Sequence, residues 1–228
     1  MAVQIASKNR TRGWGVGTAA VARLLVAADR PLTGVAIANA VGVTQPRVSQ
    51  VLRQLGEYHA VQPTPEGYTG RRARLLDLYA SRVRPVLVEP ESYWYSTRPM
   101  AEQARRVIDI SHVIGGRVAF SADLAPDLLA PWRHPTLTIV YSEHRLDLDA
   151  ARFVPAEGLG DASIVFRWTS DATLLSPFGR WPAEVEGVPL TDPVQQWSDL
   201  LSLGGNDRLE ASVRLRRAIL TRTIQPAA

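Results

Sequence analysis

The alternation of apolar and polar residues between positions 37 and 57 predicts two short helices joined by a tight turn. The apolar residues of the second helix recur at three- and four-residue intervals, at Val48, Val51, Leu52 and Leu55. Gly42 lies just beyond the first helix, where a left-handed backbone costs glycine little. Thr44 is a suitable N-cap for the second helix, and Pro46 falls in its first turn, where no backbone donor is lost. The pattern is therefore typical of a helix-turn-helix.

The polar face of the second predicted helix carries amide, hydroxyl and guanidinium groups and no carboxylate before Glu57. Its side chains are those of Gln45, Arg47, Ser49, Gln50, Arg53 and Gln54. In the major groove of DNA, Arg reaches guanine O6 and N7, whereas Gln reaches adenine N6 and N7. An ordinary helical hairpin with a solvated polar face is the alternative. We favour a DNA-recognition helix that begins with Thr44 and Pro46, because the turn, the cap, the apolar stripe and the acid-free face coincide within one short stretch.

The stretch from residue 37 to 53 resembles the helix-turn-helix of MarR-like winged-helix repressors, whose second helix enters the major groove. Residues 58–72 follow as a short strand, a turn rich in Pro and Gly, and a basic return, which predicts a small β-wing. The arginines placed where a wing meets phosphates are Arg71, Arg72 and Arg74. Apolar residues at 75–79 then predict a further helix that ends before residue 84.

Segment boundaries follow from these elements and from the prolines between them. Residues 1–13 are predicted to be a basic arm, in which Arg10 and Arg12 lie along phosphates or in a minor groove, with a solvated tail as the alternative. Residues 14–84 form the predicted winged helix-turn-helix, beginning with a helix over 17–28. Residues 85–91 are predicted to be a linker to a second domain, residues 92–228.

The second predicted domain mixes strands and helices, so that the fold class of the chain is α/β (α+β). Strands are predicted at 92–97, 118–121, 136–141, 163–168 and 188–191. Helices are predicted at 99–114, 122–129, 192–203 and 207–220. Asp192 caps the third of these helices, and Gly204-Gly205 separates it from the last.

Composition limits the class of protein. The 228 residues are 46% hydrophobic and 21% charged, which is typical of a globular chain. The absence of cysteine excludes disulfides, thiolate catalysis and cysteine metal ligands. Because the sequence has no long apolar run and no secretion signal in its first residues, we expect a cytoplasmic protein that does not bind membranes.

Basic residues are concentrated in the first part of the chain. Residues 1–85 contain 12 basic and 4 acidic residues, a net charge of +8, whereas the remainder contains 14 basic and 18 acidic residues, a net charge of −4. The basic part is the part with the predicted helix-turn-helix, as DNA binding requires. A basic helix on a membrane surface is the competing explanation, but it needs a long amphipathic helix, and Gly and Pro interrupt this region.

Residues 188–212 resemble the closing signature of the AbiEi-type antitoxins of type IV toxin–antitoxin systems: a hydrophobic-Pro turn, an Asp-Leu-Leu helix, a glycine break and an Arg-x-x-Glu-Ala helix. Residues 118–125 and 137–141 resemble the middle region of that family. The resemblance implies a transcriptional repressor that binds repeats in its own promoter and counters a cognate toxin, with or without touching it. The implied partners are double-stranded DNA, the toxin, and a second copy of the chain as a homodimer or in cooperative assembly on DNA.

An enzyme is the alternative function. Gly115-Gly116, followed by Phe120-Ser121 and a strand, is faintly similar to a nucleotidyltransferase core, so that a degenerate fold of that type is an alternative for the second domain. Nucleotidyl transfer needs two or three metal-binding carboxylates on adjacent strands, and the strand at 136–141 has none. Asp147 and Asp149, near His144, would share a face only if their stretch is a strand; we favour a solvated loop. We therefore expect no catalytic residue, no metal site, no cofactor and no enzymatic activity.

Overall fold

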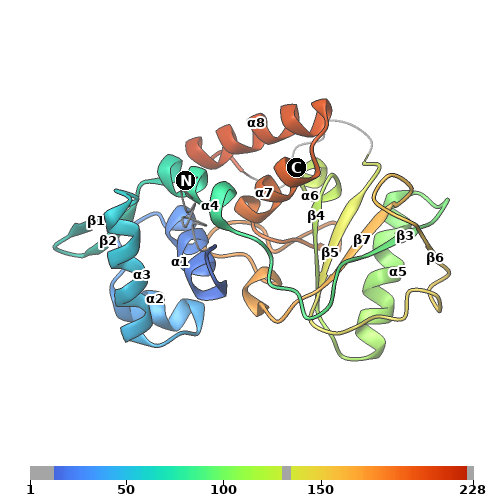
Figure 1. Ribbon diagram of the computed structural model, residues 1–228, viewed down its shortest axis with the longest axis horizontal. Helices are drawn as coiled ribbons and strands as arrows, with labels where there is room; N and C mark the ends of the chain where they lie inside the picture. Colours follow the sequence, from blue (N-terminus) through green and yellow to red (C-terminus); the bar gives the residue numbers. More distant parts are fainter. Residues whose placement is uncertain (1–12, 130–134, 225–228) are drawn as a thin grey trace, which may run out of the picture.

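The chain is arranged as a helical lobe at one end and a five-stranded sheet with its own helices at the other (Figure 1). This is a mixed α/β fold, as predicted. The computed structural model describes residues 13–129 and 135–224. The two arm residues proposed to contact DNA, Arg10 and Arg12, lie outside the described residues.

The helical lobe contains the elements predicted for residues 14–84, in the predicted order. Its elements are α1 (Val16–Ala27), α2 (Gly34–Val41), α3 (Gln45–Glu57), β1 (Val61–Thr64), β2 (Gly67–Gly70) and α4 (Arg72–Arg82). Strands β1 and β2 form an antiparallel hairpin in which Thr64 lies opposite Gly67. The apolar stripe of α3 is buried as predicted, because Val48, Val51, Leu52 and Leu55 are each at most 4% exposed.

The turn between α2 and α3 follows from the residues that flank it. Thr33 caps α2, since its hydroxyl accepts a hydrogen bond from the backbone N–H of Ala36 at 3.2 Å. Gly42 ends α2 with φ of +73°, the left-handed conformation expected of it. Pro46 lies in the first turn of α3, and Thr44 is its N-cap residue, but the Thr44 side chain makes no capping hydrogen bond. The predicted cap position is therefore right and the predicted cap interaction is wrong.

The sheet has the strand order β4-β5-β7-β3-β6, and only β5 and β7 are parallel. Its strands are β3 (Ser92–Tyr95), β4 (Val118–Ala122), β5 (Thr138–Ser142), β6 (Val154–Pro155) and β7 (Ile164–Trp168). The helices of this half are α5 (Met100–Val113), α6 (Leu124–Leu129), the 3₁₀ helix η1 (Ala172–Leu174), α7 (Pro193–Leu203) and α8 (Asn206–Thr221). A separate small hairpin joins β8 (Glu184–Val185) to β9 (Val188–Pro189). The pattern did not predict β6 or β8, because two residues are too few to show alternation.

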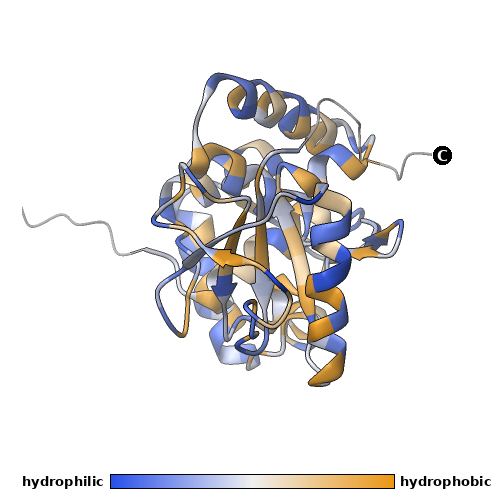
Figure 2. Cartoon of the chain, turned by 90° about the vertical axis from the view of Figure 1, so that its right-hand side faces the viewer, coloured by the Kyte–Doolittle hydropathy of each residue, from blue (hydrophilic) through white to orange (hydrophobic). Residues whose placement is uncertain are grey.

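The sheet separates two apolar layers because successive residues of a strand point to opposite faces. Phe120, Val140 and Phe166 belong to the core that includes the apolar side of α5. Ile139 and Val165 belong to a smaller cluster on the opposite face, toward α7. Figure 2 shows the apolar colours concentrated along the central strands, with hydrophilic positions on the outer side of α5.

The segment between the lobes is tied to the sheet. The backbone N–H of Val88 donates to the carbonyl of Trp168 at 2.8 Å, and the Thr169 hydroxyl donates to the carbonyl of Val86 at 2.8 Å. Residues 85–91, predicted to be a linker, therefore run along the end of β7 and are held there by hydrogen bonds. Apolar residues of both lobes also belong to one continuous core.

A buried arginine joins the two lobes. Arg23 of α1 is 1% exposed, and its Nε lies 2.9 Å from Oδ2 of Asp192, an ion pair whose angle falls outside hydrogen-bond geometry. Asp192 is also the N-cap of α7, because its Oδ1 accepts from the N–H groups of Val194 and Gln195 at 3.0 and 3.1 Å. Asp171 adds a second carboxylate, 3.7 Å from Nη2 of Arg23.

The buried polar contacts continue from Arg23 into the sheet. Nη1 of Arg23 donates to the Tyr79 hydroxyl of α4 at 3.1 Å, and that hydroxyl donates to Oε1 of Gln195 at 2.6 Å. Nε2 of Gln195 donates to Oδ1 of Asp199 at 3.0 Å, and Nη1 of Arg167 donates to the same oxygen at 2.9 Å. We call this set the junction network: Arg23, Tyr79, Tyr141, Arg167, Asp171, Asp192, Gln195 and Asp199. It links α1 and α4 to α7 and then to β5 and β7.

The pKa directions in the junction network follow from burial and charge. Burial opposes the charge on Arg23, yet the pKa of its guanidinium is raised above its usual value because two carboxylates and the Tyr79 oxygen surround it. Burial raises the pKa of the Asp192 carboxyl, an effect that the Arg23 charge and two backbone N–H groups of α7 oppose. Burial also raises the pKa of Tyr141 well above its usual value. Burial likewise raises the pKa of Tyr79, so both hydroxyls stay protonated: that of Tyr79 donates to Gln195, and that of Tyr141 donates to Oδ1 of Asp199 at 3.0 Å.

Replacing Arg23 with Met should lower the free energy of unfolding by about 3–5 kcal/mol, because it leaves Asp192 and Asp171 buried without their cation. Urea denaturation of the full chain measures this change. Arg105→Met is the matched control: Arg105 is exposed on α5, and its loss should change stability by less than about 0.5 kcal/mol. Adding Asp192→Asn to Arg23→Met should restore part of the loss, since an amide needs no counter-charge. If Arg23→Met alone is as stable as the parent chain, Arg23 does not have this role.

Candidate nucleic-acid interface

The outer face of α3 presents the residues predicted to read DNA. The exposed residues of this set are Thr44, Gln45, Pro46, Arg47, Ser49, Gln50 and Arg53. Gln54 is half-buried. The apolar stripe on the other side of α3 holds the helix against the lobe, so the polar face is turned outward as a unit. The structure therefore brings together one continuous polar surface from residues spread over two and a half helical turns.

Hydrogen bonds along this surface are few and long. Arg47 donates through Nη2 to the Thr18 hydroxyl of α1 at 3.3 Å and through Nη1 to Oε1 of Gln50 at 3.4 Å. The Ser49 hydroxyl donates to the carbonyl of Gln45 at 3.2 Å. The two Arg47 bonds lie at the long end of the hydrogen-bond range, so the guanidinium can exchange them for stronger partners at little cost. Thr18 carries no periodic signal in its apolar stretch, and sequence analysis did not find it.

The β1–β2 hairpin is attached to the body of the lobe beside the turn into α2. The backbone N–H groups of Leu32 and Tyr68 each donate to the other residue's carbonyl, at 3.0 and 2.9 Å. Gly67 approaches so closely that a Cβ atom there would lie 2.4 Å from the Leu32 carbonyl oxygen, and its φ is +138°. Only glycine fits this contact. The hairpin therefore has a fixed position relative to α3.

The three arginines predicted to follow the wing have different surroundings. Arg71 is exposed, and Arg74 is exposed with its Nε donating to the carbonyl of Tyr58 at 3.1 Å. Arg72 is half-buried: its Nε donates to the carbonyl of Val26 at 2.8 Å and its Nη2 to the carbonyl of Ala28. Burial lowers the pKa of Arg72. Arg72 thus binds the carbonyls at the C-terminal end of α1, whereas Arg71 and Arg74 are surface cations.

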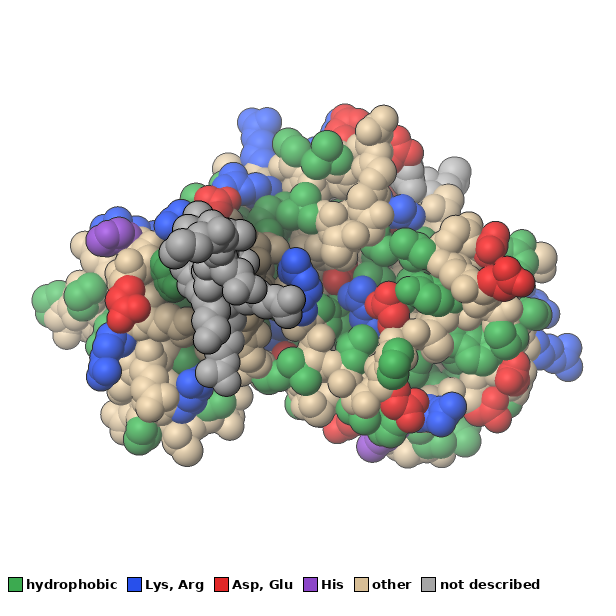
Figure 3. Space-filling view, in the orientation of Figure 1, with side chains coloured by type: hydrophobic (Ala, Val, Ile, Leu, Met, Phe, Trp, Pro, Cys, Tyr) green, Lys and Arg blue, Asp and Glu red, His purple; other side chains and the backbone are tan. Residues whose placement is uncertain are grey.

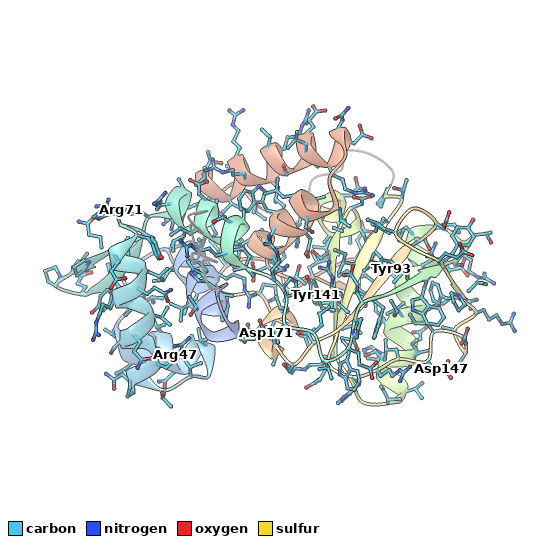
Figure 4. The ribbon with its side chains drawn as sticks, in the orientation of Figure 1. Arg47, Arg71, Tyr93, Tyr141, Asp147 and Asp171 are labelled. Atoms are coloured by element: carbon cyan, nitrogen blue, oxygen red, sulfur yellow. The ribbon has the colours of Figure 1, made fainter. Side chains whose placement is uncertain are left out.

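Positive side chains outnumber acidic ones on this lobe. Residues 13–84 carry nine arginines and four acidic residues, and Arg23 is the one of these arginines enclosed in the junction network. In the view of Figure 3 the acidic side chains gather mainly on the sheet lobe. Arg47 and Arg71 both lie on the helical lobe, away from Tyr141 and Asp147 (Figure 4). The basic half of the sequence is therefore also a basic end of the molecule.

The carboxylates considered for the enzyme alternative do not lie on a strand. Asp147 and Asp149 are exposed in a turn, and Oδ1 of Asp147 accepts from the N–H of Ala150 at 3.1 Å. Within residues 13–129 and 135–224, no group of three His, Asp or Glu side chains converges as a metal site would.

Comparison with protein-family models, with curated proteins and with solved structures gave no match to this chain. In the described part of the chain, no helix is long and apolar enough to cross a bilayer.

Replacing Gly67 with Ala should destabilise the hairpin by about 1–3 kcal/mol, because the new Cβ meets the Leu32 carbonyl in a backbone conformation unfavourable to Ala. Thermal unfolding and amide hydrogen exchange at Tyr68 measure the effect. Gly34→Ala is the control, since a Cβ at Gly34 meets no atom within 4 Å and the residue begins α2. Parent-like stability and an equally protected Tyr68 amide in Gly67→Ala would contradict the fixed position of the hairpin.

Proposed function

We propose that this protein is a sequence-specific regulator that binds double-stranded DNA through α3 and the β1–β2 hairpin. The observation that carries the proposal is the outer face of α3, where exposed Gln and Arg side chains form one surface with no carboxylate from Pro31 to Gly56. The short α2, the glycine turn, the buried stripe of α3 and the β1–β2 hairpin support our proposal that this part of the chain is a winged helix-turn-helix. In that motif the second helix lies in the major groove and the wing contacts the backbone.

The contacts divide by chemistry. In this arrangement Arg47 and Gln50 face base edges, where their side chains can form paired hydrogen bonds with guanine and adenine. Arg71 and Arg74 are exposed beyond the hairpin and are suited to phosphates, which position a protein without reading sequence. Arg72 is engaged at the end of α1, so we assign it to holding the lobe together.

The resemblance to AbiEi-type antitoxins supports a finer proposal, in which the protein represses its own promoter and counters a toxin from the cytoplasm. Repeats in a promoter would bind two or more copies, as a homodimer or cooperatively. The gene beside this one tests the proposal: a nucleotidyltransferase-like toxin whose growth defect is relieved by co-expression of this chain supports it. A neighbouring product that is harmless without this chain contradicts the antitoxin part and leaves DNA binding untouched.

The direct test of the interface is selection of bound sequences from a random duplex library, followed by gel shifts with the full chain. Arg47→Ala and Gln50→Ala should each lose about 1–3 kcal/mol of discrimination at one base pair. Arg71→Ala should weaken all sequences alike and reduce the slope of log K against log salt by about 0.9, because one phosphate contact is lost.

Arg105→Ala on α5 is the matched control, because it removes an exposed arginine at the other end of the molecule. Its DNA affinity and salt slope should equal those of the parent chain. Unfolding midpoints are measured for every variant, since Arg47 also contacts Thr18 of α1. If Arg47→Ala and Gln50→Ala both keep the parent affinity and sequence preference, α3 is not the recognition helix.

A further inference from the structure

The sheet lobe contains a cavity of about 420 Å³ at the end of the molecule away from α3. Strands β3 and β7 form its floor, and residues 145–149 and 89–90 form its walls. All of these residues belong to the described part of the chain. Figure 4 shows Asp147, on one wall, far from Arg47 and Arg71. Neither the proposed DNA interface nor the junction network uses this cavity.

The floor of the cavity is aromatic. Trp94 of β3 lies opposite Ile164 of β7, so it shares a face of the sheet with Phe166 and Trp168, which follow at two-residue intervals. Each indole N–H already has a partner: that of Trp94 donates to the Ser92 hydroxyl at 2.9 Å, and that of Trp168 to the Glu143 carbonyl at 3.1 Å. Both indoles are half-buried. The two rings that line the cavity are therefore each anchored by a hydrogen bond.

The rim of the cavity is acidic. Glu89, Asp147 and Asp149 line it with one arginine, Arg145, whose guanidinium lies 3.9 Å from Glu89. The Arg145 side chain is 74% exposed, so it extends into solvent rather than closing the cavity. Three carboxylates against one guanidinium give the lining a negative charge, with acceptors exceeding donors. Ligands with phosphate or carboxylate groups are disfavoured by repulsion at this rim.

The wall that carries the aspartates is pinned to the lobe. Leu146 and Leu148 are buried, at 7% and 1% exposure, whereas Asp147 and Asp149 between and after them face outward. The backbone N–H of Phe153 donates to the Leu148 carbonyl at 3.0 Å, which closes the loop. The sequence favoured a solvated loop over a strand for this stretch, and the two exposed carboxylates line one rim of the cavity. The backbone of the rim is thus held in place beside the floor.

We propose that this cavity binds a small organic cation, an alkylammonium or guanidinium compound. The ring faces attract a cation through their quadrupoles, as in the aromatic cages that bind quaternary ammonium groups. The carboxylates supply the opposite charge, and the apolar floor accepts methyl or methylene groups. Both kinds of cation share this chemistry, so choline and methylguanidine are the two probes. This site is independent of DNA binding by α3.

The test is a calorimetric titration of the full chain with choline, with methylguanidine and with 3,3-dimethylbutan-1-ol, the neutral isostere of choline. We expect at least one cation to bind and the isostere to bind more weakly by roughly tenfold, because it lacks the charge that rings and carboxylates attract. If neither cation binds, or if the isostere binds as well as choline, the proposal is overturned. Binding of both cations supports a site for organic cations in general, and binding of one narrows the class.

Variants of the rim and floor locate the site. Asp147→Asn with Asp149→Asn should weaken cation binding by roughly fivefold, because it removes two negative charges from the rim. Arg145→Ala should strengthen binding by about twofold, because it removes the one positive charge there. Trp168→Phe should weaken it by roughly threefold while keeping an aromatic ring, because Trp is the strongest π partner.

The matched control is Glu184→Gln with Glu186→Gln, an alternating pair of exposed acids in the β8–β9 hairpin, outside the cavity. It should leave cation affinity unchanged. If it weakens binding as much as the aspartate pair does, the effect is one of overall charge and the cavity is not the site. Gel shifts with DNA should be the same for the aspartate pair and the parent chain, so that failure of this proposal is distinguishable from failure of DNA binding.

Discussion

The charge of Arg23 is the constraint on which the arrangement of the molecule depends. A guanidinium at 1% exposure on α1 needs carboxylates beside it. Asp192 and Asp171, both supplied by the other lobe, meet that need, and Asp192 simultaneously caps α7. Separating the lobes would leave three charges without partners in places where water had been excluded, which is far more costly than losing a surface ion pair.

The junction network joins the helical lobe and the sheet lobe into one body. Helix α4 contributes Tyr79, whose hydroxyl accepts a hydrogen bond from Arg23 and donates one to Gln195 of α7. Gln195 in turn donates to Asp199 of the same helix. Two partly exposed ion pairs, Arg216–Asp77 and Arg222–Asp29, also join the helical lobe to the region of α8. The orientation of α1 therefore depends on contacts with both lobes. Since the buried stripe of α3 packs in the same core as α1, the outer face of α3 is positioned by contacts that extend to the sheet.

The proposed DNA surface and the proposed cation cavity use opposite electrostatic designs at the two ends of the same body. At α3, guanidinium and amide groups project without carboxylates, which suits a polyanion. At the cavity, carboxylates line the rim above an aromatic floor, which suits a compact cation. The segment that follows α4 leaves the helical lobe and reaches the cavity, where the Val88 N–H donates to the Trp168 carbonyl and Glu89 begins the rim. A basic lobe and an acidic lobe are therefore physically connected through residues 86–91.

The sequence by itself determined the local elements and the polar face of α3. Helical periodicity, the Gly42 turn, the Pro46 start and the Asp192 cap are encoded by residues a few positions apart, so their signals survive without tertiary information. The sequence could not reveal that Arg23 is buried, because the two carboxylates that pair with it, Asp171 and Asp192, lie more than 140 residues away along the chain. It could not separate Arg72, bonded to the end of α1, from its exposed neighbours Arg71 and Arg74. It assigned the alternating Asp147 and Asp149 to a possible strand or a solvated loop, and only packing of the intervening leucines placed them on a cavity rim. Long-range pairing of charges and the choice of which polar side chains are buried are decided by the tertiary structure, since they depend on distances that no local pattern contains.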